Sequence, residues 1–357
     1  MNIAFVNATK GWGGVKTWYL QFAERLARRG NRVYVYGRQP EFVEAARERV
    51  GHAEQVRFGA DLNPVAITFF LREFRRRNVE AVIVNIGKAL ATAGLAARLL
   101  GLPVVQRIGL PGDISPRLKT RLLHAWIRPA FLCPCRFIAE GFVKELPYVR
   151  PEDVHVILNG KKAVSEPLEG HHPRRLICTQ QLNPDKGHDV LLQALAGLSD
   201  PFELHIWGKG RAEVSLKTLA DELGLGQRVF WHGFSLNIME ALRQGDIFLL
   251  ASLSEGLPNT LLEAMAAGLL PVCRDVGGVR EVIPEDLWAW LLPYEADEAA
   301  FAEALRRALT LPDADLLALR ERARQACRED FDIDRQAERL EGWLQSVVQG
   351  EKACFRC

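Results

Sequence analysis

Short apolar, β-rich runs alternate with longer helical stretches along most of the 357-residue chain. In the first half these runs are Ile3–Asn7, Val33–Tyr36, Ala81–Asn85 and Val104–Ile108. In the second half they are Leu176–Thr179, Glu203–Trp207, Val229–Trp231, Ile247–Leu250 and Pro271–Cys273. Near-continuous apolar strands that alternate with helices are typical of parallel sheets covered on both faces. The pattern therefore predicts an α/β fold with two doubly wound, Rossmann-like parallel-sheet domains facing a cleft.

The helical stretches include Thr17–Arg29 and Leu90–Leu100, the second followed by Gly101 and Pro103 as stop signals. A polar segment rich in Gly, Pro and His, "LNGKKAVSEPLEGHHPRR" at 158–175, separates the two sets of strands. We therefore place the first domain at 1–165 and the second at 166–335. Residues 336–357 form a C-terminal helix and tail, which we expect to pack back on the first domain.

The net charge of +2 conceals an asymmetry between the halves. Residues 1–165 hold 26 Lys and Arg against 13 Asp and Glu, whereas residues 166–357 hold 20 against 31. This contrast of +13 with −11 indicates that the first domain meets an anionic surface or substrate. The apolar runs fall short of the roughly 18 residues of a spanning helix, and the first residues lack the basic start of a signal peptide. We expect a cytoplasmic protein.

The seven cysteines are scattered and odd in number, which is typical of reduced thiols in the cytosol. Two pairs lie close in sequence, Cys133 with Cys135 and Cys354 with Cys357. Neither pair has a second Cys or His pair at zinc-finger spacing, so the cysteines predict no metal site. The role of the C-terminal pair stays open.

The stretch "FVNATKGWGGVKTWYL", residues 5–20, looks at first like a phosphate-binding loop. A Walker loop needs glycine directly before the lysine, where Val15 stands before Lys16, and the glycine spacing also differs from G-x-G-x-x-G. Gly13 and Gly14 still permit close approach of the backbone to a ligand, at the amino end of a helix and next to the Lys16 cation. The alternative is an ordinary tight turn between a strand and a helix.

Two carboxylates eight positions apart, Glu255 and Glu263, mark the segment "SLSEGLPNTLLEAMAAGLLPVCRDVGGVREVI" at 252–283. Pro258 suits the first turn of a helix over Thr260–Ala267, which Gly268 ends. The free amides at the start of this helix can bind an anion. Carboxylates on either side of such amides suit a nucleotide sugar, because they can accept hydrogen bonds from hydroxyl groups. A solvated acidic pair is the alternative.

This segment resembles the E-x7-E motif of the retaining nucleotide-sugar glycosyltransferases of family GT4, which have the GT-B fold. The resemblance extends over most of the chain, through the Gly13–Gly14 loop, "VHVILNGK", "QLNPDKGHDVLLQAL", "ELHIWGKG" and "RVFWHGF" in the usual order. It implies that Lys186 neutralises the departing diphosphate and that Glu255 binds a hydroxyl of the transferred sugar. Glu263 would accept hydrogen bonds from the ribose.

The resemblance also implies a larger set of groups that bind the sugar-nucleotide donor. Their main-chain or side-chain atoms would contact the sugar, the phosphates or the base: Gly13, Gly14, Lys16, Gln181, Lys186, Gly233, Glu255, Gly256, Leu257, Pro258, Asn259, Thr260 and Glu263. Among these, Lys186 and Glu255 are the candidate catalytic residues. Neither motif glutamate is implied to act as a nucleophile, so the resemblance favours a front-face reaction in which the departing phosphate takes the acceptor proton.

The chain departs from the family pattern at two places. Gln181 in "QQL" stands where the family usually has an arginine, which removes a bidentate phosphate ligand. Lys209 or Arg274 would have to compensate. Relatives often carry a histidine where "VVQRIGLPGD" offers Arg107 and Asp113, which become the acceptor-side candidates.

The function that the resemblance implies is transfer of a sugar, with retention of configuration and without metal or cofactor, in cell-surface polysaccharide or lipopolysaccharide assembly. The alternative is a catalytically weakened relative that acts as a binding or scaffolding subunit; a sugar-nucleotide epimerase lacks a convincing acid/base set. The segment 115–131 is basic and amphipathic at helical spacing, which favours a glycan or lipid-linked acceptor and peripheral contact with the inner, anionic face of the cytoplasmic membrane. Ordinary helices with solvated arginines are the alternative. Nucleic-acid binding is not expected, because the basic domain lacks interleaved aromatic residues.

Overall fold

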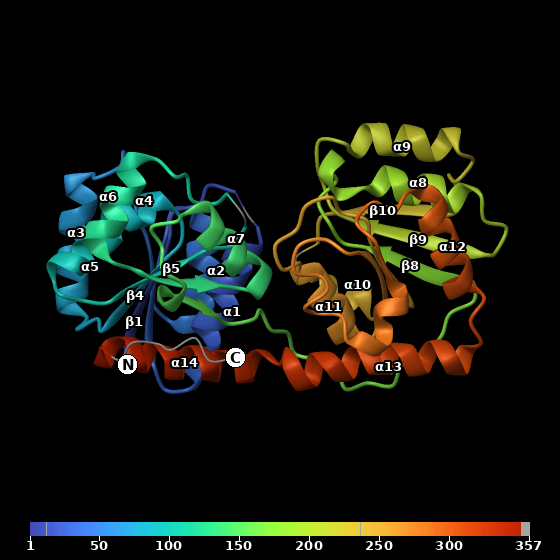
Figure 1. Ribbon diagram of the computed structural model, residues 1–357. Coiled ribbons are helices and arrows are strands. Elements are labelled where there is room, and N and C mark those ends of the chain that lie inside the picture. The colour runs from blue at the N-terminus through green and yellow to red at the C-terminus, as the bar shows by residue number, and fades with distance from the viewer. Residues whose placement is uncertain (12, 111, 236, 351–357) are drawn as a thin grey trace. The chain divides into compact units, whose positions relative to one another are not determined.

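A computed structural model describes residues 1–11, 13–110, 112–235 and 237–350 of the protein (Figure 1). The chain forms two compact units. Unit 1 contains Met1–Asn159 together with the segment that begins at Ile333, and unit 2 contains Gly160–Asp332. The limits predicted from the sequence are 165 and 335. The Cys354 and Cys357 pair lies outside the described residues.

Unit 1 is built on a seven-stranded sheet with the order β3-β2-β1-β4-β5-β6-β7, in which all neighbouring strands are parallel. Its strands are β1 (Asn2–Asn7), β2 (Arg32–Gly37), β3 (Ala53–Gln55), β4 (Ala81–Val84), β5 (Val104–Arg107), β6 (Ala130–Cys133) and β7 (Val154–Val156). The helical elements are α1 (Gly14–Arg28), α2 (Pro40–Val50), α3 (Pro64–Arg76), α4 (Gly87–Ala89), the π-helical turn η1 (Leu90–Gly94), α5 (Leu95–Leu99), α6 (Leu118–Ile127), α7 (Arg136–Glu145), the 3₁₀ turn η2 (Pro151–Asp153) and α14 (Ile333–Gln349).

The side chains of alternate strand residues in unit 1 pack into two separate hydrophobic cores, one on each face of the sheet. In β1, Ile3 and Phe5 pack with α1, α2 and α14, whereas Ala4 and Val6 pack with α3, η1 and α5. Successive side chains of a strand point to opposite faces, so an apolar residue at every position requires helices on both sides. The sheet is therefore covered on both faces, as the sequence predicts.

The last described helix, α14, belongs to unit 1 and lies beside α1 (Figure 1). Its buried residues Ile333, Ala337, Leu340 and Leu344 recur at helical spacing and join the same core as Ile3. Ionic contacts at the edge of the helix supplement this burial, including one of 2.6 Å between Arg29 Nε and Glu341 Oε2. Helix α14 thus completes the core on one face of the amino-terminal sheet.

Unit 2 has a six-stranded parallel sheet with the order β10-β9-β8-β11-β12-β13. Its strands are β8 (Arg174–Cys178), β9 (Phe202–Trp207), β10 (Val229–Gly233), β11 (Ile247–Leu250), β12 (Leu270–Arg274) and β13 (Leu291–Leu292). The helical elements are the 3₁₀ turn η3 (Pro184–Lys186), α8 (His188–Ala196), α9 (Glu213–Glu222), α10 (Ile238–Leu242), α11 (Asn259–Ala267), the 3₁₀ turn η4 (Glu285–Trp290), α12 (Glu298–Leu309) and α13 (Asp313–Asp330). Helices α8, α9 and α12 lie on one face, and α10, α11 and α13 lie on the other (Figure 1).

The predicted strands coincide with observed ones to within two residues at either end. The predicted apolar runs do not include β3, β6, β7 and β13, which have three, four, three and two residues. Segments of two or three residues provide too few positions for a periodic signal, and pairing with a neighbouring strand decides their conformation. The expected helix Leu90–Leu100 is divided between η1 and α5.

A buried ion pair joins α13 to the start of β11 in unit 2. Arg320 Nη1 lies 2.7 Å from Asp246 Oδ1, and both side chains are almost completely buried. The guanidinium also donates to the carbonyls of Gly268 and Gly245, and Asp246 Oδ2 accepts the main-chain N–H of Arg175. The pair therefore ties helix α13, strand β8 and the start of β11 into one network.

We expect Arg320→Met to lower the free energy of unfolding of unit 2 by about 3–5 kcal/mol, because it leaves the buried Asp246 carboxylate without its cation. Arg322→Met on the same helix is the matched control, since the side chains of Arg322 and its partner Asp286 are 38% and 54% exposed. That change should cost about 0–1 kcal/mol. Urea unfolding followed by circular dichroism measures both values, and equal losses would contradict the assignment.

Candidate functional site

The order of the strands in unit 2 reverses direction between β8 and β11. From β8 the chain continues to β9 on one side, and it returns to β11 on the other. In open parallel sheets, ligands bind at the carboxyl ends of the strands where the order reverses. The segments that follow β8 and β11 contain Lys186 and Glu255, so the fold brings two of the predicted site residues to this position.

Lys186 and Glu255 form a direct ion pair. The Nζ atom of Lys186 lies 2.9 Å from Glu255 Oε1 and donates a second hydrogen bond of 2.9 Å to the carbonyl of Ser254. Asp185 Oδ2 is 3.3 Å from the same ammonium. Both paired side chains are mostly buried, which strengthens their attraction relative to a surface pair. The structure thus holds a lysine and a carboxylate together, 69 positions apart in the chain.

The backbone around Lys186 is fitted closely to the end of β11. Gly187 has a φ of +66°, and a Cβ atom there would lie 2.3 Å from the carbonyl oxygen of Ala251. The main-chain N–H of Leu253 donates to the carbonyl of Asp185 at 2.8 Å. Only glycine tolerates both this conformation and this approach. Gly187 therefore sets the separation between the two segments that carry the ion pair.

Helix α11 begins at Asn259, directly after Glu255–Pro258, and Glu263 lies in its second turn. Gly256, Leu257 and Pro258 are buried, whereas Asn259, Thr260 and Glu263 are partly exposed. The turn is supported from below, because Gly278 donates its N–H to the Gly256 carbonyl at 2.7 Å, and a Cβ atom on Gly277 would reach the Glu255 carbonyl. The first turn of α11 has no acidic residue, so its amides keep their affinity for an anion.

The second motif carboxylate, Glu263, is paired with Lys161. The Lys161 Nζ to Glu263 Oε1 distance is 2.7 Å, and the two side chains are 5% and 15% exposed. Lys161 ends the segment "VHVILNGK", but it is not among the site residues predicted from the sequence. A separation of 102 positions leaves no local pattern that could have indicated the contact.

Three buried polar groups at the same edge of the sheet have no hydrogen-bond partner among the described residues. They are the hydroxyls of Thr179 and Ser252, which follow β8 and β11, and the imidazole of His188 at the start of α8. Burial lowers the pKa of His188 to about 4, so this ring is neutral at pH 7. Unsatisfied buried polar groups are costly, and these three lie in or beside the segments that carry the Lys186–Glu255 pair.

Three residues that are expected near the donor or its phosphates, Gln181, Lys209 and Gly233, lie close to one another in unit 2. Gln181 is exposed and its Oε1 accepts from Asn183 Nδ2 at 3.1 Å. The loop after β9 packs directly on this segment, since a Cβ atom on Gly208 would lie 2.2 Å from the Gln180 carbonyl. Lys209 in that loop is exposed, and its Cε is 3.5 Å from where a Cβ of Gly233 would stand. Gln181 and Lys209 therefore lie on adjoining loops, and Gly233 at the end of β10 lies beside Lys209.

Arg274 does not supply the missing phosphate ligand. Its side chain is buried, its Nε donates to the Ala251 carbonyl at 3.0 Å, and its Nη1 donates to the carbonyls of Ala296, at 2.7 Å, and Tyr294. Burial lowers the pKa of this guanidinium, and Tyr294 opposes that shift. These contacts do not favour Arg274 as a replacement for an arginine at position 181, because its Nε and Nη1 atoms already donate to carbonyl oxygens. Lys209 is the remaining candidate.

In unit 1 the order of the strands reverses between β1 and β4, and the glycine loop follows β1. Gly13 has extended backbone and precedes α1, whose first residue is Gly14. A Cβ atom on Gly13 would meet no described atom within 4 Å, so the backbone is open to an approaching group. The first N–H groups of α1 are free of helical acceptors by geometry.

Lys16 is directed into the protein. Its side chain is buried, and its Nζ lies 5.8 Å from the centroid of the Phe42 ring. Burial lowers the pKa of Lys16, and Glu41 opposes this shift. Lys16 shares a helical face with the buried Tyr19 and Ala23, a spacing that could have indicated burial from the sequence.

The acceptor-side candidates have structural contacts in this loop region. The guanidinium of Arg107 is buried 4.7 Å from the Trp18 ring centroid, and burial lowers its pKa to about 10. Asp113 is exposed, and its Oδ2 accepts the main-chain N–H groups of Gly109 and Leu110, each at 2.8 Å. Asp113 thereby fixes the loop after β5, while Arg107 lies beneath it.

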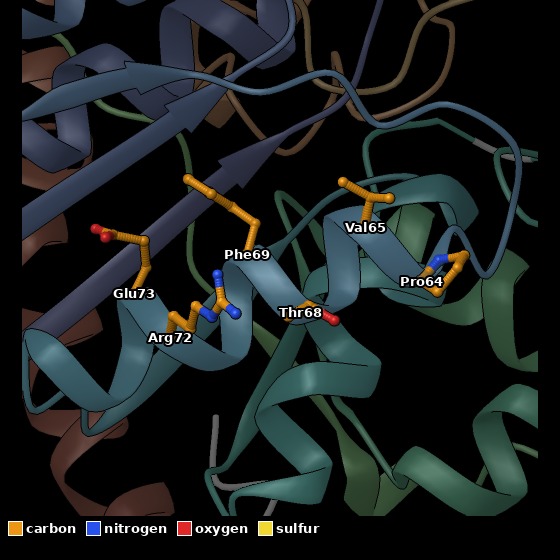
Figure 2. A pocket seen from close by; sticks show the side chains of 6 residues that line it. All are labelled: Pro64, Val65, Thr68, Phe69, Arg72 and Glu73. Atoms are coloured by element: carbon orange, nitrogen blue, oxygen red, sulfur yellow. The ribbon is translucent and has the colours of Figure 1, made fainter.

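Outside these positions, a hollow of about 530 Å³ runs along the exposed side of α3. Figure 2 shows its six lining side chains on that one helix: Pro64, Val65, Thr68, Phe69, Arg72 and Glu73. None of them is a predicted site residue. Glu73, with His52 and Glu54, also forms a group whose ligand atoms lie within 4.8 Å of one another. Arg76 and Arg77 already pair with Glu73, so their positive charges oppose a metal ion there.

Two family models match the chain in succession. Glycosyltransferase Family 4 matches residues 12–161, and Glycosyl transferases group 1 matches residues 161–330. Both describe glycosyltransferases, and together they extend over both parallel sheets. The class defined by this fold and these residues is the GT-B glycosyltransferases. The chain belongs to the GT4-type family within that class.

Curated relatives are similar in part. The amylovoran biosynthesis glycosyltransferase AmsK of Erwinia amylovora is 35% identical over 172 residues, which are 45% of this chain and 42% of that protein. The putative colanic acid biosynthesis glycosyltransferase WcaL of Escherichia coli K12 is 33% identical over 181 residues, 48% of this chain and 43% of that protein. The chain thus matches less than half the length of each.

A longer match is to the UDP-Gal:α-D-GlcNAc-diphosphoundecaprenol α-1,3-galactosyltransferase of Escherichia coli, 26% identical over 65% of this chain and 67% of that protein. Among solved structures, a glycosyltransferase of Rickettsia africae has a TM-score of 0.83 at 15% identity, over 98% of this chain and 99% of that one. HepE of Anabaena in complex with UDP-glucose has a TM-score of 0.79 at 18% identity, over 97% and 100%. At these identities the structural likeness shows the fold alone.

We expect Gly187→Ala to weaken nucleotide binding and to lower the free energy of unfolding by about 1–3 kcal/mol, because the new Cβ atom would meet the Ala251 carbonyl in a left-handed conformation. Gly197→Ala at the other end of α8 is the control, since a Cβ atom there has open space. Urea unfolding and calorimetric titration with UDP, GDP and ADP test both variants. Equal behaviour of the two would show that the close approach does not position Lys186.

Proposed function

We propose that the protein is a glycosyltransferase that moves a sugar from a nucleotide diphosphate sugar to an acceptor hydroxyl, with retention of configuration, in the assembly of a cell-surface polysaccharide or lipopolysaccharide. The observation that carries this proposal is the Lys186–Glu255 pair at the reversal of the strand order, directly before α11. The arrangement offers a cation and helix amides to a diphosphate, and carboxylates to sugar hydroxyls.

The rate enhancement in this proposal comes from stabilising the charge that develops on the departing diphosphate. Lys186 and the amides at the start of α11 are in place before the reaction begins. They therefore need little reorganisation energy when the bond breaks. Each such group is typically worth about 3 kcal/mol. Glu255 holds a hydroxyl of the transferred sugar, and its pairing with Lys186 positions both groups. In unit 1, the glycine loop at Gly13 and Gly14 contributes main-chain N–H groups to substrate binding.

Retention of configuration follows, in this proposal, from reaction on one face of the sugar. The acceptor hydroxyl attacks as the bond to the diphosphate breaks, and a phosphate oxygen takes the acceptor proton. The neutralising role is assigned to Lys186 and the amides, so we propose that catalysis needs no metal ion. One similar protein is named for UDP-Gal and for a diphosphoundecaprenol-linked acceptor, and one structural neighbour was solved with UDP-glucose. UDP-sugars are therefore the first donors to test, and a lipid-linked diphosphate sugar is the first acceptor class.

We expect Lys186→Met and Glu255→Gln each to reduce kcat by about 100- to 1,000-fold, since each removes a group that acts on the reacting sugar or its leaving group. The donor is first found by thermal shift with UDP-, GDP- and ADP-sugars, because a bound ligand raises the melting temperature. Transfer and hydrolysis are then assayed with and without EDTA. Lys217→Met, which removes an exposed ion pair on α9, is the control.

Full activity in Lys186→Met would contradict the assigned role of this lysine. Donor binding without transfer or hydrolysis in the wild-type protein would instead favour the alternative, a catalytically weakened binding or scaffolding subunit, for which Gln181 is the motivating departure. Loss of activity in EDTA that Mg²⁺ restores would contradict the proposed metal independence alone.

We also propose peripheral contact with an anionic membrane at its cytoplasmic face through α6. Leu118, Leu122 and Trp126 lie four positions apart on this helix and are 71%, 61% and 47% exposed. Exposed basic residues border this apolar stripe: Arg117, Lys119, Arg121 and Arg128. Apolar side chains among basic ones suit the headgroup region of an anionic bilayer. Among the described helices, none has the length and apolar character to cross a membrane.

We expect the wild-type protein to sediment with vesicles that contain phosphatidylglycerol and to bind weakly to phosphatidylcholine alone. Added salt should release it, because screening weakens attraction between the basic residues and the lipid headgroups. Leu122→Ser with Trp126→Ser should abolish sedimentation. The control is Val214→Ser on α9, which removes an apolar side chain that is 78% exposed from unit 2. Binding that ignores both lipid charge and salt would contradict this docking mode.

A further inference from the structure

Each of the two motif carboxylates has its own lysine. Glu255 Oε1 lies 2.9 Å from Lys186 Nζ, and Glu263 Oε1 lies 2.7 Å from Lys161 Nζ. The four side chains sum to no net charge, although two of them are glutamates near the proposed position of a diphosphate. An uncompensated Glu263 would repel that anion, and the repulsion would be strong because the group is mostly buried.

The main chain at Lys161 is fixed independently of its side chain. Its N–H donates to the Phe331 carbonyl at 2.8 Å, and Lys161 forms an isolated parallel bridge with Asp332. The Sγ atom of Cys327 in α13 lies 4.0 Å from the Lys161 carbonyl and 3.9 Å from the Leu262 carbonyl in α11. The residues on either side of the ion pair are thus held by the same helix, which limits the movement of the ammonium relative to Glu263.

Stability alone does not account for this pair. Apolar residues of similar volume commonly replace a buried ion pair without loss of stability, because burial of both charges is costly. The pair does, however, constrain the carboxylate. With Oε1 engaged by Lys161, Oε2 is the oxygen that remains to accept hydrogen bonds from a neighbouring diol.

We propose that Lys161 is a positioning residue for recognition of the ribose of the sugar-nucleotide donor, acting through Glu263. This inference rests on the proposed function and on the role that the family resemblance implies for Glu263, which is to accept hydrogen bonds from the ribose hydroxyls. Lys161 fixes one carboxylate oxygen, orients the other toward the diol, and cancels the glutamate charge beside the diphosphate. Specificity for ribose over deoxyribose nucleotides therefore depends on a residue that does not itself contact the ribose.

The test is the affinity of the protein for UDP compared with 2′-deoxy-UDP and 3′-deoxy-UDP, measured by calorimetry, with GDP and ADP and their deoxy forms in parallel. We expect the wild-type protein to prefer a ribose nucleotide about tenfold, the loss typical of one hydrogen bond to a charged group. Lys161→Met and Glu263→Gln should both abolish this preference. Lys161→Arg should retain it, since the charge and a donor to Oε1 remain.

The matched control is Lys162→Met, which removes the exposed neighbouring lysine and its contact with Asp332. It should keep the full ribose preference. The double variant Lys161→Met with Glu263→Gln contains no unpaired buried charge, so it keeps the test available where Lys161→Met alone folds poorly. Its preference should equal that of Glu263→Gln, because Lys161 acts through that carboxylate.

The outcomes separate this inference from the proposed function. A wild-type ribose preference that Glu263→Gln removes and Lys161→Met retains would overturn the role of Lys161 and leave the donor site intact. A wild-type protein that binds none of the nucleotides would overturn both. A loss of preference in Lys162→Met equal to that in Lys161→Met would show a general structural effect, and would also reject the specific role.

Discussion

The parallel alignment of β8 with β11 is the constraint on which the candidate site depends. These strands are neighbours in space but are separated in the chain by β9 and β10, so their carboxyl ends bring together segments that are about 70 residues apart. Gly187 then allows the two following segments to approach to the limit set by a carbonyl oxygen. The Lys186–Glu255 contact is a consequence of this backbone geometry, since two long side chains on loosely placed loops would sacrifice much conformational entropy to meet.

Charge compensation is the second theme of unit 2. Lysines neutralise both motif glutamates, and Asp246 forms an ion pair with Arg320. The guanidinium of Arg274 donates hydrogen bonds to carbonyl oxygens. The buried guanidinium groups of Arg274 and Arg320 therefore hold the framework, whereas Lys186 is partly exposed and Lys209 is exposed. Solvent accessibility distinguishes the cations that can bind a diphosphate from those that stabilise the fold. The number of arginines and lysines in the sequence does not make this distinction.

Sequence patterns revealed the class of fold and the motif segment because both are local. The apolar strands are visible as continuous runs, and Glu255 and Glu263 lie on either side of a helix start that proline and glycine define. The remainder depended on tertiary structure. Lys161 meets Glu263 across 102 positions, Arg274 is withdrawn by carbonyls from two other segments, and the rotation of α1 about its axis buries Lys16. The spacing of Lys16 from Tyr19 carried that last signal, but a glycine-rich loop beside a lysine favoured the ligand interpretation.

The origin of α14 has a consequence for the order of events during synthesis. Unit 1 begins with the first residues of the chain, yet Ile333, Leu340 and Leu344 belong to the core that surrounds Ile3 and Phe5. A ribosome must therefore make all of unit 2 before the amino-terminal sheet receives its last covering helix. Until then the apolar surface that α14 later covers is open to solvent. Chaperones can bind these apolar residues in the nascent chain before α14 has been synthesised.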